Sequence, residues 1–247
     1  MSLLCAILLG IIQGLTEFIP VSSSTHLHLA KDLLSISEPS ILFDLSCHFG
    51  TLFALVLYFR HEIVELLRFK RQKLLLFFLA LVPLVPAYLL LRPVREWAGR
   101  EGVVGYFLMV TALLLFLGEK VRFSATRTRP VRDALLIGTM QAAALIPGIS
   151  RSASTISCAR ALGWNAGDAA RFSFLLSIPT ILGGSGLELL KAVRSSAPFD
   201  LLPCLVGALF SFVIGFAVIR FAMRYLEKGR LIPFAVYCFI LGVVLLI

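Results

Sequence analysis

Long runs of apolar residues alternate with short polar loops along the 247-residue chain. A helix needs about 20 mostly apolar residues to cross a bilayer. Six segments meet this requirement, at 41–60, 74–92, 103–118, 169–187, 201–221 and 232–247. The pattern therefore predicts an all-α integral membrane protein with six transmembrane helices.

Two further apolar stretches, 3–34 and 134–163, are interrupted in the middle by proline and by polar residues. The interruptions run from Pro20 to His26 and from Pro147 to Thr155. A lipid-facing helix cannot carry such a break, because its freed backbone groups would find no water to bind. Broken segments are tolerated where they line a cavity in the protein, so we expect the functional site there.

Basic residues are distributed unevenly among the loops. Three loops carry 14 Lys and Arg residues, whereas the loops at 92–101 and 188–200 carry 5. The three basic loops are 60–73, 119–132 and 220–230. The positive-inside rule places them in the cytoplasm. The loops at 119–132 and 220–230 are separated by two full spans and by the segment 134–163. Both loops can be cytoplasmic only if 134–163 crosses the membrane an even number of times, as a re-entrant hairpin or, less favourably, as two very short spans.

If 3–34 is also re-entrant, the two hairpins enter from opposite sides, which describes an inverted-topology repeat. A short sequence match agrees with this, since Gly10-Ile-Ile-Gln13 precedes Pro20 and Gly138-Thr-Met-Gln141 precedes Pro147. We therefore predict one polytopic membrane domain over 1–247. Its first repeat covers approximately 1–118, with re-entrant segment 3–34, and its second approximately 134–247, with re-entrant segment 134–163.

The composition excludes an ordinary soluble domain, because 59% of the residues are hydrophobic and only 15% are charged, against about 25% in soluble proteins. The net charge of +9 comes from the membrane-flanking loops, so we expect the lipid bilayer and no nucleic acid as a partner. The five cysteines form no CxxC pair, which favours small buried hydrophobic residues over a disulfide or zinc site.

The first interrupted stretch carries the first candidate site. Gln13 and Glu17 are four residues apart and would share a face of a helix. A charge at membrane depth is costly, so Glu17 needs a cation, a metal ion or a proton. Ser22, Ser23 and Ser24 follow, and the hydroxyls of Ser23 and Ser24 could be nucleophiles, metal ligands or helix caps.

His26 follows the serines and could be a general acid, a base or a nucleophile, or only a hydrogen-bonded core residue. The other histidines, His28, His48 and His61, have no comparable setting in the sequence. Asp44 and His48 are four residues apart near the external end of 41–60, where they would either support the site or mark the membrane interface.

The second interrupted stretch carries Ser150, Arg151, Ser152 and Thr155. The fork of donors on arginine matches phosphate oxygens, and hydroxyls with free N–H groups at a helix start complete an anion site. A structural Arg–Glu pair or a channel-type anion constriction would use the same residues.

Both stretches resemble the motifs of one family. Gln13-x-x-x-Glu17, continuing through Pro20-Val-Ser-Ser-Ser to His26, resembles an (E/Q)xxxE motif, and the segment from Pro147 to Thr155 resembles PGxSRSxxT. Together they are similar to the undecaprenyl-diphosphate phosphatases (UppP, also BacA), and the resemblance covers essentially the whole chain.

The resemblance implies hydrolysis of undecaprenyl diphosphate to undecaprenyl phosphate and inorganic phosphate, which recycles the carrier lipid for peptidoglycan synthesis and confers bacitracin resistance. It further implies six spanning helices and two re-entrant hairpins in the bacterial inner membrane, with a site open to the periplasm, and a divalent cation, Mg²⁺ or Ca²⁺. The resemblance is compatible with a monomer and with a homodimer.

Carried over by motif position, Gln13 and Glu17 would help to bind the metal or would position water. Glu17, Ser23, His26 and Arg151 would be catalytic, with Ser23, His26 or water as nucleophile. The residues that would contact the substrate are Ser22, Ser24, Ser150, Arg151, Ser152 and Thr155.

Thr25 and Ala153 stand where the family usually has glycine, and they would be strained if those positions require a positive φ.

Two other functions use similar residues. A phosphatidic-acid-type lipid phosphatase is rejected, because the chain has no PSGH and no histidine after Arg151. A transporter or flippase of a prenyl-phosphate lipid would share the inverted repeat and the midplane arginine. It would not need the Glu17, serine and His26 set, which favours chemistry.

Overall fold

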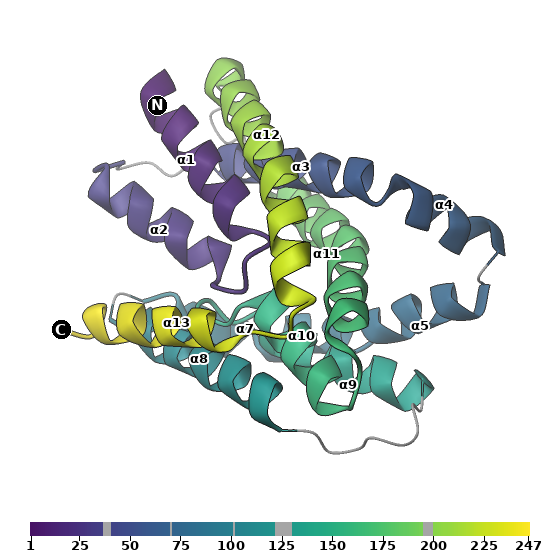
Figure 1. The fold of residues 1–247 in the computed structure, drawn as a ribbon. Helices are drawn as coiled ribbons and strands as arrows, with labels where there is room; N and C mark the ends of the chain where they lie inside the picture. The colour runs from purple at the N-terminus through teal and green to yellow at the C-terminus, as the bar shows by residue number, and fades with distance from the viewer. Residues whose placement is uncertain (37–40, 70, 101, 122–129, 195–199) are drawn as a thin grey trace. The chain divides into compact units, whose positions relative to one another are not determined.

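The computed structural model describes residues 1–36, 41–69, 71–100, 102–121, 130–194 and 200–247, and these residues form helices and no strand (Figure 1). The helices are α1 (Leu3–Thr16), α2 (Ser23–Leu33), α3 (Ile41–Tyr58), α4 (Arg60–Phe69), α5 (Arg71–Leu81), α6 (Leu84–Leu90), α7 (Arg92–Ala98), α8 (Val104–Lys120), α9 (Pro130–Ala143), α10 (Arg151–Ala161), α11 (Ala166–Arg194), α12 (Leu201–Leu226) and α13 (Ile232–Val244). The all-α prediction is confirmed.

Four stretches of the described residues are long and apolar enough to cross a membrane. They are Ile41–Tyr58, Gln72–Leu90, Ala166–Arg194 and Leu201–Leu226. The second is not one continuous helix, because a turn at Val82–Pro83 separates α5 from α6. The expected spans at 103–118 and 232–247 correspond to α8 and α13, which have 17 and 13 residues.

Two segments expected to be loops contain helices. The segment 60–73 holds α4 and the start of α5, and 92–101 holds α7. Charged residues such as Glu62 and Arg68 favour a helix as well as a solvated loop, so charge alone did not separate the two. Of the 14 basic residues counted in the loops 60–73, 119–132 and 220–230, four lie outside the described residues: Lys70, Arg122, Arg127 and Arg129.

Each interrupted stretch folds into a pair of helices. The first gives α1 and α2, which contact each other, and the second gives α9 and α10, which do the same. Both pairs combine a helix of 14 residues with one of 11. At 1.5 Å per residue the longer helix spans about 21 Å, which is less than the thickness of a bilayer core.

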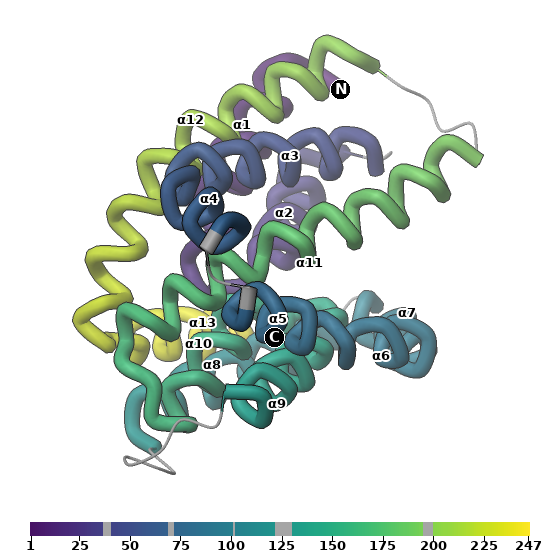
Figure 2. The backbone as a smooth tube through the Cα atoms, turned by 90° about the vertical axis from the view of Figure 1, so that its right-hand side faces the viewer, coloured from purple at the N-terminus to yellow at the C-terminus, as the bar shows by residue number. Residues whose placement is uncertain are grey.

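Internal contacts divide the chain into two compact units, and each is described by itself. The first unit comprises residues 1–18, 23–60 and 177–221, and the second comprises 19–22, 61–176 and 222–247. α11 and α12 each contribute residues to both units; Figure 2 traces the two as continuous tubes.

In the first unit, the core lies among α1, α2, α3 and the beginning of α12. Leu9, Leu27, Phe43, Cys47 and Cys204 are buried members of one apolar cluster there. All five cysteines of the chain are free, and Cys47, Cys204 and Cys238 are buried, as expected of small hydrophobic residues.

In the second unit, α8 packs against both α10 and α13. Glycines allow this close approach. A Cβ atom on Gly105 would lie 2.6 Å from the carbonyl oxygen of Gly242 on α13, and one on Gly118 would lie 2.5 Å from Cβ of Ser157 on α10. Larger residues would push the helices apart, so these glycines set the spacing of α8 from α10 and from α13.

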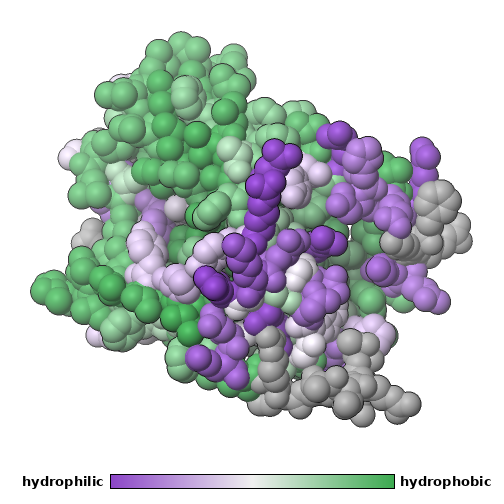
Figure 3. Space-filling model, in the orientation of Figure 1, coloured by the Kyte–Doolittle hydropathy of each residue, from purple (hydrophilic) through white to green (hydrophobic). Residues whose placement is uncertain are grey.

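Apolar side chains also cover exposed surface. Leu202, Leu205, Leu209 and Val213 follow one face of α12 and are all exposed. Figure 3 shows this apolar surface along the first half of α12, with polar surface toward the end of the helix. An apolar face of this size is typical of contact with lipid.

Candidate active site

Polar side chains of the first unit meet where α1 ends and α2 begins. Glu17 directly follows α1 as its C-cap, and Ser23 is the first residue of α2. Oε2 of Glu17 accepts hydrogen bonds from Nε2 of Gln13 at 2.9 Å and from Oγ of Ser23 at 2.7 Å. Gln13 and Glu17 are buried. The expectation that they share a helix face is confirmed, and a carboxylate lies beside a hydroxyl that it could deprotonate.

His48 of α3 joins the same cluster. Nδ1 of His48 lies 2.9 Å from Nε2 of Gln13 and 3.7 Å from Oε2 of Glu17. Of the two roles open to His48 from the sequence, support of the site or a place at the membrane interface, these contacts favour support of the site. Gln13 and His48 are 35 residues apart, on different helices, so no local spacing could reveal the contact.

The connection between α1 and α2 has an unusual backbone. Ser22 is buried and has φ +69°, a left-handed conformation that favours glycine. Thr25 and Ala153 instead lie inside α2 and α10, and neither has a positive φ. The glycine-like position is therefore at Ser22, and the two replacements cause no backbone strain.

A loop held by α8 precedes α10 in the second unit. Oγ of Ser150 caps α10 by accepting a hydrogen bond from the backbone N–H of Ala153 at 3.3 Å. The N–H of Ser150 donates to Oγ1 of Thr111 at 3.0 Å, and that hydroxyl donates to the carbonyl oxygen of Gly148 at 2.9 Å. Gly148 has φ +93° and packs against α8, so the glycine is required there.

Arg151 is the first residue of α10, where the free N–H groups and the helix dipole favour an anion. Oγ1 of Thr155 donates to the carbonyl oxygen of Arg151 at 2.9 Å and lies 2.6 Å from Oγ of Ser173 on α11. Oγ of Ser152 lies 3.3 Å from Oγ of Ser150. These buried hydroxyls support the turn that presents Arg151.

The predicted site residues thus form two local clusters. One contains Gln13, Glu17 and Ser23, with His26 three residues after Ser23 on α2 and Ser24 exposed between them. The other contains Ser150, Arg151, Ser152 and Thr155. The first cluster belongs to the first unit and the second to the second unit, whereas Ser22 is assigned to the second unit.

Gln13 and Glu17 fit a hard cation. Oε1 of Gln13 is buried and has no hydrogen-bond partner among the described residues, which costs about 1–3 kcal/mol. Amide and carboxylate oxygens are the donors that Mg²⁺ and Ca²⁺ prefer. The described residues contain no group of three or more His, Cys, Asp or Glu suited to a metal. Mg²⁺ needs only one or two carboxylates when phosphate and water complete its coordination.

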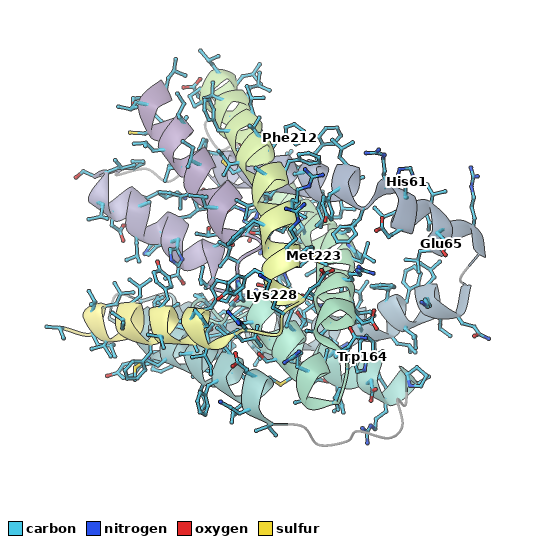
Figure 4. The ribbon with its side chains drawn as sticks, viewed as in Figure 1. His61, Glu65, Trp164, Phe212, Met223 and Lys228 are labelled. Carbon is cyan, nitrogen blue, oxygen red and sulfur yellow. The ribbon has the colours of Figure 1, made fainter. Side chains whose placement is uncertain are left out.

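A cavity of about 650 Å³ lies elsewhere in the second unit. Glu65 of α4 and Trp164, just before α11, line it (Figure 4). The rings of Phe77 and Phe172, also in its lining, stack with centroids 4.6 Å apart. None of the predicted site residues lines this cavity.

Comparison with known proteins identifies the family. The family described as "Bacitracin resistance protein BacA" matches residues 6–244. The chain belongs to this family. Proteins named undecaprenyl-diphosphatase are similar over nearly their full length. That of Protochlamydia amoebophila (strain UWE25) is 39% identical over 96% of this chain and 95% of its own.

Two further relatives with the same name agree. The protein of Halothermothrix orenii is 37% identical over 100% of this chain and 98% of its own, and that of Desulfosudis oleivorans is 40% identical over 96% and 94%. The resemblance drawn from the two motifs is confirmed. Family membership and the apolar helices together make the chain a multi-pass membrane protein.

Proposed function

We propose that the chain hydrolyses undecaprenyl diphosphate to undecaprenyl phosphate and inorganic phosphate, and so recycles the carrier lipid and confers bacitracin resistance. The observation that carries this is the buried Gln13–Glu17–Ser23 cluster, a carboxylate beside a hydroxyl in the motif that matches the family. Relatives named undecaprenyl-diphosphatase cover the whole chain, which supports the same substrate.

The first cluster supplies the nucleophile and the proton transfers in this proposal. The carboxylate of Glu17 takes the proton of Ser23, whose oxygen forms a bond to the terminal phosphorus. The bond from that phosphorus to the bridging oxygen breaks, and His26 gives a proton to the departing undecaprenyl phosphate. Water then hydrolyses the phosphoserine, which releases inorganic phosphate and restores the Ser23 hydroxyl.

The second cluster binds the diphosphate. Arg151 at the start of α10 neutralises charge on the transferred phosphoryl group. Ser152 donates to phosphate oxygens, while Ser150 and Thr155 act through the hydrogen bonds that hold the turn. Ser22, in the connection between α1 and α2, and Ser24, in the first turn of α2, contribute further hydroxyls.

Gln13 and Glu17 would hold the divalent cation, Mg²⁺ or Ca²⁺. When bound, it supplies positive charge that offsets the diphosphate oxygens. The carbonyl groups that end α1 add negative potential at the same place, which favours a cation there.

The proposed topology has six spans and two re-entrant hairpins in the bacterial inner membrane, with the site open to the periplasm. The matched lengths of the α1/α2 and α9/α10 pairs support an inverted repeat. Gly10 and Gly138, equivalent in the sequence match, both approach another backbone, with a Cβ falling 2.7 Å from the Gly207 oxygen and 2.3 Å from the Ala80 oxygen. The proposal is compatible with a monomer and with a homodimer.

The test measures phosphate release from undecaprenyl diphosphate by purified protein in detergent. We expect release that EDTA abolishes and Mg²⁺ or Ca²⁺ restores, and that Glu17→Ala lowers by at least about 100-fold. Glu96→Ala is the matched control, because Glu96 is an exposed carboxylate on α7 paired only with Arg92 in the bonds observed. If folded protein releases no phosphate with any divalent cation, the result would favour the alternative function, a transporter or flippase of a prenyl-phosphate lipid.

A further inference from the structure

The amide of Gln13 is held from two sides. Its Nε2 lies 2.9 Å from Oε2 of Glu17 and 2.9 Å from Nδ1 of His48. A carboxylate can only accept hydrogen bonds, so the NH₂ end of the amide must face Glu17. The amide has two N–H donors, and one serves each partner. The orientation of the Gln13 side chain is therefore fixed by its neighbours.

The same bonds define the state of His48. A ring nitrogen that receives an N–H must carry a lone pair, so Nδ1 is unprotonated and the ring proton is on Nε2. At 3.7 Å, Nδ1 is too far from Oε2 of Glu17 for a direct hydrogen bond. His48 therefore contacts the catalytic cluster through Gln13.

The backbone around His48 is itself anchored. The carbonyl oxygen of His48 accepts a hydrogen bond from Oγ1 of Thr51 at 2.9 Å. The carbonyl oxygen of Cys47 accepts one from Oγ of Ser211 on α12 at 2.8 Å. Gly50, two residues after His48, packs directly on the α12 backbone. α3 consequently presents His48 from a fixed position.

The consequence falls on the other end of the amide. With both N–H groups engaged, Oε1 of Gln13 points away from them, and it is buried without a hydrogen-bond partner among the described residues. An oxygen left in this state beside a carboxylate is ready to coordinate a hard cation.

We propose that His48 is a positioning residue that holds the Gln13 amide so that its oxygen, together with Glu17, can bind the divalent cation. The proposal rests on the proposed function for its catalytic meaning. His48 itself touches neither the cation nor the substrate. Residues of this kind typically change metal affinity or activity by 10–100-fold when removed.

The experiment measures binding of Mn²⁺, as a probe for the cation, to the purified full chain in detergent without substrate, from the electron paramagnetic resonance signal of free Mn²⁺. We expect His48→Leu to raise the dissociation constant of Mn²⁺ by about 10–100-fold. His48→Gln keeps an acceptor for the Gln13 amide and should stay within about 3-fold of the parent protein.

The controls separate a positioning role from general damage. His28→Leu replaces an exposed histidine that lies on α2 and pairs with Asp32, and it should leave Mn²⁺ binding unchanged. Where His48→Leu fails to fold, His48→Phe serves instead, since it keeps a ring without the nitrogen. In phosphate release, His48→Leu should raise the Mg²⁺ concentration for half-maximal rate and leave the KM for the lipid nearly unchanged.

Equal Mn²⁺ binding by the parent protein and both apolar variants would overturn the proposal, as would weakening by His48→Gln as large as that by His48→Leu. No Mn²⁺ binding by the parent protein at millimolar concentration would also overturn it. Loss of Mn²⁺ binding on His48→Leu in a protein that releases no phosphate would support the positioning role and refute the proposed function, so the two failures are distinguishable.

Discussion

Replacing Ser22 by glycine should separate the backbone of the α1–α2 connection from its chemistry. The left-handed conformation at φ +69° costs a residue other than glycine about 1–2 kcal/mol. Glycine loses about 0.5–1 kcal/mol more than other residues in conformational entropy on folding. Ser22→Gly should therefore be more stable than Ser22→Ala by about 0.5–1 kcal/mol, since both lose the hydroxyl and only glycine relieves the backbone. Ser22→Ala keeps the strained backbone and should give no such gain.

The two Ser22 variants should fail alike in catalysis. A hydrogen bond to a charged group contributes about 1.5–3 kcal/mol, so loss of the hydroxyl should lower kcat/KM by about 10–100-fold in both. Ser35 is the matched control, because it is the other described non-glycine residue with a positive φ and is exposed, away from the candidate clusters in sequence. Ser35→Gly should stabilise the protein by a similar amount and leave kcat/KM unchanged.

Stability is measured by thermal unfolding in detergent, and kcat/KM by phosphate release. Equal stability of Ser22→Gly and Ser22→Ala would refute the assignment of strain to the Ser22 backbone. Unchanged kcat/KM in both would remove its hydroxyl from the substrate site. Because the two readouts are independent, one half of the reasoning can fail without the other.

Three further results are expected. Gly118→Ala places a Cβ 2.5 Å from Ser157 and should destabilise the protein by about 1–3 kcal/mol in thermal unfolding. Gly183→Ala, whose Cβ would have nothing within 4 Å, should stabilise the protein by up to about 1 kcal/mol. A change of the same sign in both variants would contradict the packing argument. Glu119→Ala, which removes the acceptor for two backbone N–H groups at the start of α13, should cost about 1–2 kcal/mol, and Glu119→Gln clearly less. Arg151→Lys should lower kcat of phosphate release by at least about 100-fold with unchanged thermal stability, and near-normal kcat would remove Arg151 from phosphate binding.

The sequence predicted the elements that depend on local pattern. The proline and serine interruptions located the α1/α2 and α9/α10 pairs, and the four-residue spacing placed Gln13 against Glu17. These succeed because helical periodicity and chain breaks are properties of neighbouring residues.

What the sequence left out depends on tertiary contacts. His48 reaches Gln13 only because α3 packs beside α1, and the four-residue spacing of Asp44 and His48 could not identify Gln13 as the partner. The positive φ at Ser22 has no signal in the sequence, because the positions where the family usually has glycine are those of Thr25 and Ala153. A backbone conformation is set by the turn as a whole, so a replaced glycine does not locate it.

The contact between α8 and α13 limits where a lipid can enter. A Cβ on Gly105 would strike the Gly242 backbone, and one on Gly242 would lie 2.8 Å from the Gly105 oxygen, so the two main chains touch without side chains between them. A shift of one residue along either helix would bring Tyr106 or Val243 into this contact and force the helices apart. The α8–α13 boundary is therefore closed at this level, and an apolar chain cannot pass between the two helices there.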